Sequence, residues 1–178
     1  MKNNEEIKSV PLDIASLKFP ERLTQKDKEL IIEQCILQHA TSREQILGFA
    51  EAYISAKTLG SDTEKLAALT PSEMKEYIMR WAEIIEKRNQ KGFRRIPVRF
   101  ANMTRGIDPE NIERALEGLI DAFIGNAVNP LEYYTDFETI HPFEDGNGRV
   151  GDLLWKLAII RETGEWPETL PPDVFGSH

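Results

Sequence analysis

The chain has 178 residues, 40% of them hydrophobic, and a formal net charge of −8 at pH 7. This length and composition can supply one hydrophobic core, and no shift in composition divides the chain, so we expect a single domain. A negative field repels phosphate backbones and anionic lipids, which argues against nucleic acid or a membrane as the main partner. The sequence shows neither an apolar leader nor an apolar run of about 18 residues, and we therefore expect a cytoplasmic protein.

The N-terminal part of the chain predicts an arm followed by helices. Residues 1–22 carry two prolines among mixed polar residues and should form the arm, so that the domain spans residues 23–178. Thr24 can cap a first helix, and capping boxes at Ser42 and Thr70 open two more. Apolar residues at helical spacing give these helices a buried face, which includes Ile46, Phe49, Tyr53, Met74, Ile78, Trp81 and Ile85.

A basic, β-prone segment, residues 92–100, interrupts the helical pattern. Pro97 restricts it to a sheet edge or a short hairpin. Taken by itself, the segment is typical of a solvated edge whose charges prevent aggregation. Asp108 followed by Pro109 then predicts the start of another helix. Its buried face contains Ile112, Leu116, Leu119 and Phe123.

The most reactive side chains lie together in residues 141–149, which read His-Pro-Phe-Glu-Asp-Gly-Asn-Gly-Arg. A capping box at Asn129 predicts a short helix before this loop, ending near Ile140. Apolar residues at helical spacing predict another helix from just after Gly148 to about Thr163. The loop therefore meets a helix N-terminus, where unpaired amides and the helix dipole favour an anion.

The side chains of the loop suit a site for phosphate and magnesium. Gly146 and Gly148 permit positive φ and let a phosphate approach the backbone amides closely. Asn147 tolerates the left-handed region, and Arg149 adds a positive fork. Asp145 offers the hard oxygen ligand that Mg²⁺ takes alongside substrate phosphates.

His141 is the candidate general base, because a neutral imidazole near pH 7 can accept a hydroxyl proton. The simpler alternative is that Asp-Gly-Asn-Gly forms only a turn. A calcium-binding EF-hand does not fit, since starting the loop at Phe143 or Asp145 places Leu154 or Lys156 at the twelfth position, which requires a carboxylate. A phosphate loop of the Gly-x-x-x-x-Gly-Lys type is absent.

Residues 141–149 resemble the signature of the Fic (Fic/Doc) family, His-x-Phe-x-Asp/Glu-Gly-Asn-Gly-Arg-x-x-Arg. The resemblance extends less sharply over residues 93–163. It implies an all-α, Fic-like helical bundle with a short β-hairpin flap over the loop. It also implies a protein adenylyltransferase, which uses Mg²⁺ and moves AMP, or another phosphate-containing group, from a nucleotide such as ATP to a hydroxyl side chain of a target protein.

The resemblance assigns a role to each matching residue. It makes His141 the catalytic base and Asp145 the Mg²⁺ ligand. The nucleotide-binding residues would be Gly146, Asn147, Gly148 and Arg149. Basic residues of the flap that become candidates to face the phosphates are Arg94, Arg95, Arg99 and Arg105. The implied partners are a nucleotide and a target protein, and the resemblance leaves a separate antitoxin open as a further partner.

The chain departs from the signature at the second arginine, which is replaced by Asp152. On the expected helix, Arg149, Asp152 and Lys156 share the polar face, so Asp152 should look toward the phosphate site. A carboxylate about 5 Å from a phosphate costs on the order of 3 kcal/mol per unit charge at an effective dielectric of about 20. Either Asp152 is drawn to Lys156 or Arg149 and a flap arginine such as Arg95 replaces the lost charge, or the donor has fewer phosphates than ATP. The alternative function is a catalytically impaired module that binds a nucleotide or a protein.

Overall fold

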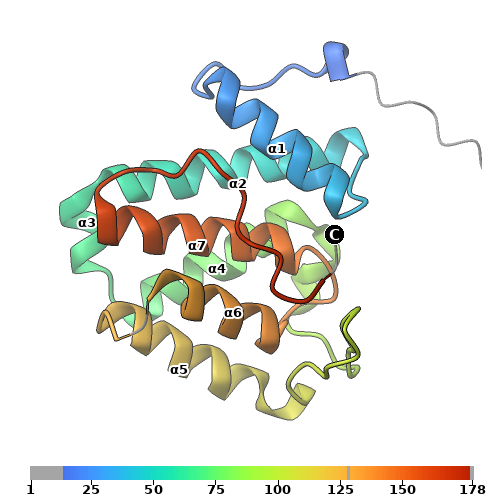
Figure 1. Cartoon of the computed structure of the whole chain (residues 1–178), viewed down its shortest axis with the longest axis vertical. Coiled ribbons are helices and arrows are strands. Elements are labelled where there is room, and N and C mark those ends of the chain that lie inside the picture. The colour runs from blue at the N-terminus through green and yellow to red at the C-terminus, as the bar shows by residue number, and fades with distance from the viewer. Residues whose placement is uncertain (1–13, 128, 177–178) are drawn as a thin grey trace, which may run out of the picture.

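The computed structural model describes residues 14–127 and 129–176. Most of the expected arm, residues 1–13, therefore lies outside the described residues. The described part folds into α1 (Gln25–Leu37), α2 (Arg43–Ser61), α3 (Thr63–Ala68), α4 (Pro71–Ile85), α5 (Ile112–Ile124), α6 (Pro130–Ile140) and α7 (Asn147–Thr163), with 3-10 helices η1 (Ile14–Ser16), η2 (Lys87–Lys91) and η3 (Pro109–Asn111) (Figure 1). The prediction of an all-α fold is confirmed. No helix of the described ranges is long and apolar enough to cross a membrane.

Capping boxes begin four of these helices, α1, α2, α4 and α6. In α6, for example, Asn129 Oδ1 accepts from the backbone N–H of Glu132 at 2.9 Å. A cap of this kind contributes about 1 kcal/mol to helix stability. Asp108 is different, because its carboxylate pairs with Arg105 at 3.2 Å and makes no capping bond. A 3-10 turn follows it, and α5 begins only at Ile112.

Helix α7 lies at the centre of the bundle and packs against α2, α4 and α6 (Figure 1). Its predicted apolar residues are fully buried: Val150, Leu153, Leu154 and Leu157. The polar residues of the opposite face, Arg149, Asp152 and Lys156, are also 0% exposed, and Asp152 does not face the cavity beside the loop as expected. Lys156 Nζ lies 2.6 Å from Asp152 Oδ1 and donates to the carbonyl of Thr169 at 2.7 Å. Partners inside the fold thus replace solvent on this face.

The other predicted apolar faces form the core as expected, and Phe49, Tyr53 and Trp81 are 0% exposed. The single cysteine, Cys35, is also buried in this core. Burial raises the pKa of its thiol to about 12, so the thiol is not a nucleophile near neutral pH.

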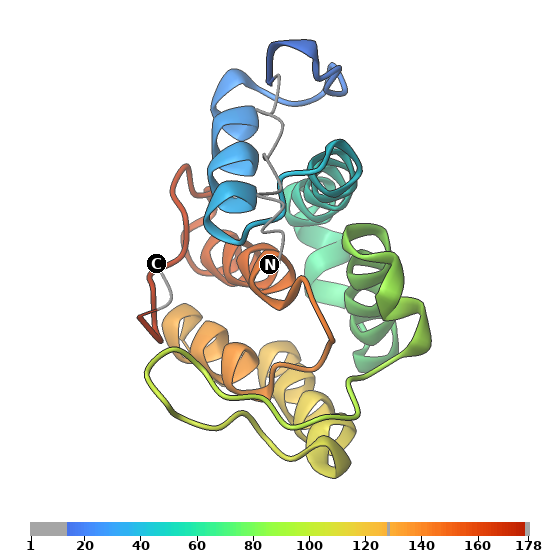
Figure 2. The same cartoon turned by 90° about the vertical axis from the view of Figure 1, so that its right-hand side faces the viewer.

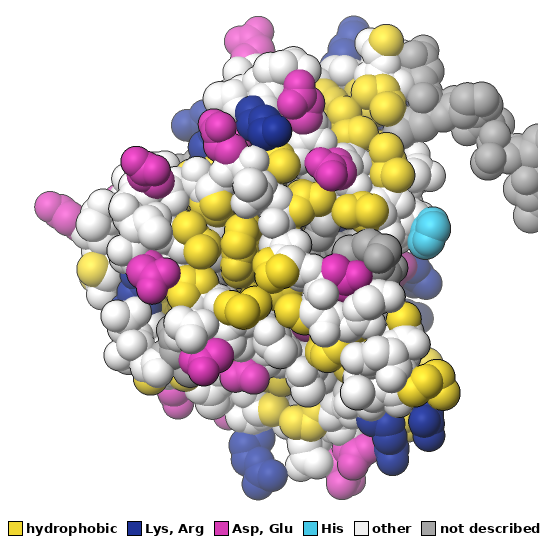
Figure 3. Space-filling model, in the orientation of Figure 1, with side chains coloured by type: hydrophobic (Ala, Val, Ile, Leu, Met, Phe, Trp, Pro, Cys, Tyr) yellow, Lys and Arg dark blue, Asp and Glu magenta, His cyan; other side chains and the backbone are white. Residues whose placement is uncertain are grey.

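The expected β-hairpin flap is not formed. Residues 93–107, which we call the basic loop, cross below α6 (Figure 2). They contain a single isolated bridge, between Arg99 and Arg105. The backbone of Met103 has φ 68° at the turn, and no neighbouring strand in the described residues extends the bridge. Lys and Arg side chains gather at this corner of the molecule (Figure 3). An isolated two-stranded hairpin is marginal in water, which explains why strands do not develop here.

The C-terminal tail, residues 165–176, turns back along the bundle after Gly164, whose φ of 81° ends α7. Trp166 Nε1 donates to Tyr53 Oη at 3.0 Å. At its far end the tail reaches the basic loop, where the rings of Phe175 and Phe100 stack with centroids 4.3 Å apart (Figure 2). The tail and the basic loop therefore meet beside the loop that joins α6 to α7.

Candidate functional site

The site is built around the loop between α6 and α7. His141 ends α6 in the left-handed region with φ 46°, and Gly146 precedes α7 with φ 76°. The side chain of Asn147 braces the turn, because it accepts from the backbone N–H of Phe143 and donates to its carbonyl, both at 2.9 Å. Phe143 is fully buried. The Asn147 side chain and the positive φ of His141 and Gly146 thus fix the shape of the loop.

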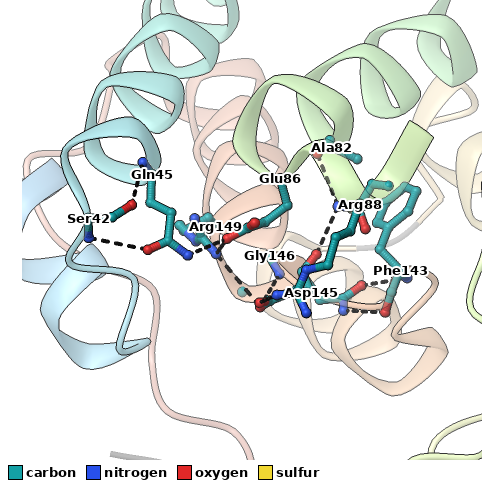
Figure 4. Close-up of polar contacts among 12 residues, drawn as sticks. Ser42, Gln45, Ala82, Glu86, Arg88, Phe143, Asp145, Gly146 and Arg149 are labelled. Atoms are coloured by element: carbon teal, nitrogen blue, oxygen red, sulfur yellow. Dashed lines mark hydrogen bonds and ion pairs between the residues drawn. The ribbon is translucent and has the colours of Figure 1, made fainter. Parts of the chain in front are cut away.

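Arg149 lies behind this loop, with 1% of its side chain exposed. Its Nη2 is 3.0 Å from Glu86 Oε1, and Gln45 Nε2 donates to the same oxygen at 2.6 Å (Figure 4). Its Nε and Nη1 are buried without a hydrogen-bond partner among the described residues. The guanidinium therefore supplies positive charge to the loop from behind and keeps two donors unused.

Asp145 is at the front of the loop, with 39% of its side chain exposed. Its Oδ1 accepts from the backbone N–H of Gly146 at 2.7 Å, and its Oδ2 pairs with Arg88 at 2.5 Å. Asn89 holds the backbone by donating to the carbonyl of Asp145 at 2.9 Å (Figure 4). The carboxylate is thus positioned by its neighbours but remains accessible.

A cavity of about 280 Å³ opens in front of the loop, between the end of α1, α6 and the tail. It brings together five of the six predicted site residues: His141, Asp145, Gly146, Asn147 and Gly148. The sixth, Arg149, is not part of its wall. The first residues of α7 have no acceptor for their amides within the helix, and Gly146, Asn147 and Gly148 line the cavity.

His141 is held as a neutral imidazole. Burial, and to a lesser extent the charge of Arg94, lowers its pKa to about 4. The ring of Phe100 meets it edge-on with centroids 5.2 Å apart, and Nδ1 is buried without a hydrogen-bond partner among the described residues. A neutral ring with an unused nitrogen can accept a proton or orient a hydroxyl group.

Arg94 has a structural role that differs from the expected one. It is 2% exposed and donates to backbone carbonyls on both sides of the site. Its acceptors are Ile96, Ile107, Ile140 and His141, at 2.5 to 3.1 Å. The guanidinium therefore ties the basic loop to the end of α6 and does not face the cavity. Arg95 and Arg99, by contrast, are exposed.

Replacing Arg94 by methionine should lower the free energy of unfolding by on the order of 3 kcal/mol, because several buried carbonyls lose their donor. Urea denaturation measures this change. Arg95→Met, which removes an exposed arginine from the next position, should change the stability little. Equal stabilities for the two variants would contradict the role given to Arg94.

Asp152 meets only the first part of the first outcome expected for it, since it pairs with Lys156. It is fully buried and does not line the cavity. The proposed replacement by Arg95 is not seen, because that side chain is exposed and does not line the cavity. Among the described residues that line the cavity, no Lys or Arg stands in for the second arginine of the signature.

Sequence reasoning missed three residues that shape the site: Glu86, Arg88 and Glu138. The first two come from the α4 end and η2, more than 50 positions before the loop, and no local pattern connects them to it. For Glu138, the sequence did contain a signal that could have identified it. It lies three residues before His141 on a helix, so both side chains had to share a face.

One of two comparisons with known proteins gives a match, and it covers the candidate site. No curated protein matches the chain in a sequence comparison. The family model of the Fic/DOC family matches residues 75–158. The matched range begins in α4, includes the basic loop and the loop at residues 141–149, and ends in α7. The chain therefore carries a Fic/DOC family domain over residues 75–158.

Proposed function

We propose that this protein transfers a nucleoside monophosphate to a hydroxyl side chain of a target protein, with AMP from ATP as the first candidate. One observation carries the proposal. The neutral imidazole of His141 lines the same cavity as the glycines that begin α7. A general base and a group of unpaired amides are the two elements that such a transfer needs.

In the proposed step, the oxygen of the target hydroxyl bonds to the α-phosphorus of the nucleotide, and His141 takes the proton that this oxygen loses. The bond from this phosphorus to the bridging oxygen breaks, and the remaining phosphates leave with that oxygen. The amides at the start of α7 face the negative charge that develops on the phosphoryl oxygens. Arg149 adds to the positive potential from behind the loop.

Magnesium fits the proposed site through Asp145. Its carboxylate is accessible at the cavity wall, and the described residues contain no cluster of three or more ligating side chains. Mg²⁺ commonly takes one or two protein carboxylates and completes its shell with phosphates and water. Bound there, the ion would neutralise phosphate charge, and Asp145 would have to exchange its contact with Arg88 for the metal.

Asp145→Asn should weaken Mg²⁺-dependent nucleotide binding, because the amide keeps the size of the side chain but loses its charge. Titration calorimetry with and without Mg²⁺ measures the effect. Glu144→Gln is the matched control, since Glu144 is the neighbouring carboxylate on the same cavity. The assignment fails if Asp145→Asn retains the Mg²⁺ dependence of the wild type.

The proposed function is tested by incubating the protein with a panel of nucleotides, Mg²⁺ and candidate acceptor proteins, followed by intact mass measurement. We expect an acceptor to gain one nucleoside monophosphate. The second candidate, a binding module without transfer, is favoured by the absence of the second arginine at Asp152. It predicts nucleotide binding with no gain in mass for any acceptor.

A further inference from the structure

Glu138 is a buried carboxyl group at the wall of the catalytic cavity. It lies on α6 between Tyr134 and His141, and the three side chains follow one face of the helix and line the cavity together. Only 8% of Glu138 is exposed. The carboxyl therefore lies next to the general base, yet the proposed transfer gives it no role.

One oxygen of this carboxyl has no partner that would explain its burial. Its Oε1 is buried without a hydrogen-bond partner among the described residues. Gly151 leaves the space for it, since a Cβ at that position would lie 2.3 Å from Oε1. The charged group that acts on it most is Asp152, which has the same sign. Among the described residues, no hydrogen bond to Oε1 and no cation compensates this carboxyl.

The fold would be more stable with an apolar side chain at this position, because an unpartnered buried polar group lowers the free energy of unfolding by about 1 to 3 kcal/mol. A group that destabilises the fold and faces a cavity is a candidate to contact a ligand. Burial, and then the charge of Asp152, raises the pKa of Glu138 to about 8. At neutral pH the carboxyl is therefore mostly protonated and can donate one hydrogen bond and accept others, as a hydroxyl group does.

The cavity offers little to a chain of three phosphates. Among the described residues that line it there is no Lys or Arg, whereas four carboxyl groups do line it: Glu138, Glu144, Asp145 and Asp173. A metal ion at Asp145 can neutralise the charge of the phosphates next to the loop. A further phosphate beside Glu138 would meet carboxyl groups and no cation.

We propose, on the basis of the proposed function, that Glu138 binds a hydroxyl group of the donor and makes the site prefer a nucleoside diphosphate whose outer phosphate carries a sugar. The sugar takes the place that a third phosphate takes in ATP. ADP-ribose and ATP are a matched pair for this choice, because they share adenosine and two phosphates and differ only in the outer group. UDP-glucose and UTP give the same comparison with another base.

Titration calorimetry with Mg²⁺ tests the inference. The wild type should bind the sugar-bearing member of one pair at least about tenfold more tightly than the triphosphate. Glu138→Met should lose this preference, while its thermal unfolding temperature is equal to or above that of the wild type. Glu138→Gln keeps a donor and an acceptor and should retain most of the preference. Asp136→Asn, on the exposed side of the same helix, is the control and should bind like the wild type.

The outcomes separate the two proposals. If the wild type binds the triphosphate as tightly as the sugar-bearing nucleotide, the inference is wrong and the proposed function stands. A loss of stability in Glu138→Met with unchanged preference would make Glu138 a structural residue and would also overturn the inference. If none of the four nucleotides binds, the proposed function fails and the inference fails with it.

Discussion

Replacing His141 by asparagine should reduce transfer to the target hydroxyl by at least about a hundredfold and leave nucleotide binding nearly unchanged. Asparagine is suited to the left-handed backbone at this position, where φ is 46°, so the fold should persist. The matched control is His39→Asn, because His39 also has positive φ, at 53°, and lines the same cavity. Transfer rates from intact mass over time distinguish the two variants. Wild-type transfer by the His141 variant would contradict its role as the base.

The pH dependence follows from the lowered pKa of His141. With a pKa of about 4, the imidazole is already neutral at pH 6, whereas an ordinary histidine would be mostly protonated there. Protonation of this base should therefore not limit the rate between pH 6 and 8, and the rate should fall only as the pH approaches about 4. A loss of rate with a midpoint near 6.5 would indicate an ordinary, solvated histidine.

Replacing Asp152 by leucine should lower the free energy of unfolding by about 3 to 5 kcal/mol, because it leaves the Lys156 ammonium buried without its carboxylate. Both side chains are 0% exposed, so solvent cannot compensate. Lys156→Met should cost a similar amount by leaving Asp152 unpaired. The double variant should be clearly more stable than the sum of the two losses predicts, since it removes both charges.

Urea denaturation of the four proteins forms the double-mutant cycle. Additive losses would show that the two charges do not depend on each other.

The buried pair also determines what we expect of Asp152→Arg, which restores the family signature. An arginine there would place a second cation beside Lys156, so we expect it to destabilise the fold and not to tighten ATP binding.

The sequence predicts those parts of the fold that local signals determine. The predicted cap at Thr24, three predicted capping boxes and the apolar spacing of α2, α4, α5 and α7 correctly identify helix starts and core faces. The nine-residue signature locates the loop, because its glycines and Asn147 define the backbone shape by themselves. Helical spacing predicts which residues of α7 share a face, but it does not predict that other segments cover the polar face.

The missing information lies in contacts between distant segments. Arg149 is covered because Glu86 comes from the end of α4, and Lys156 is covered because Thr169 comes from the tail. Arg94 looks like a surface arginine in sequence, but its four carbonyl acceptors lie on the basic loop and at the end of α6. A hairpin could be expected from β-prone residues, yet a single bridge formed, since strands need neighbours to stabilise them.

The central claim is that this domain transfers the phosphorus-containing part of a nucleotide to a protein hydroxyl with His141 as the base. The most direct test is intact mass measurement of acceptor proteins after incubation with each nucleotide of the panel and Mg²⁺, for the wild type and for His141→Asn. We predict that the wild type adds one nucleoside monophosphate to an acceptor and that the variant adds none in the same time. Equal modification by both proteins, or tight nucleotide binding by a wild type that modifies no acceptor, would contradict it.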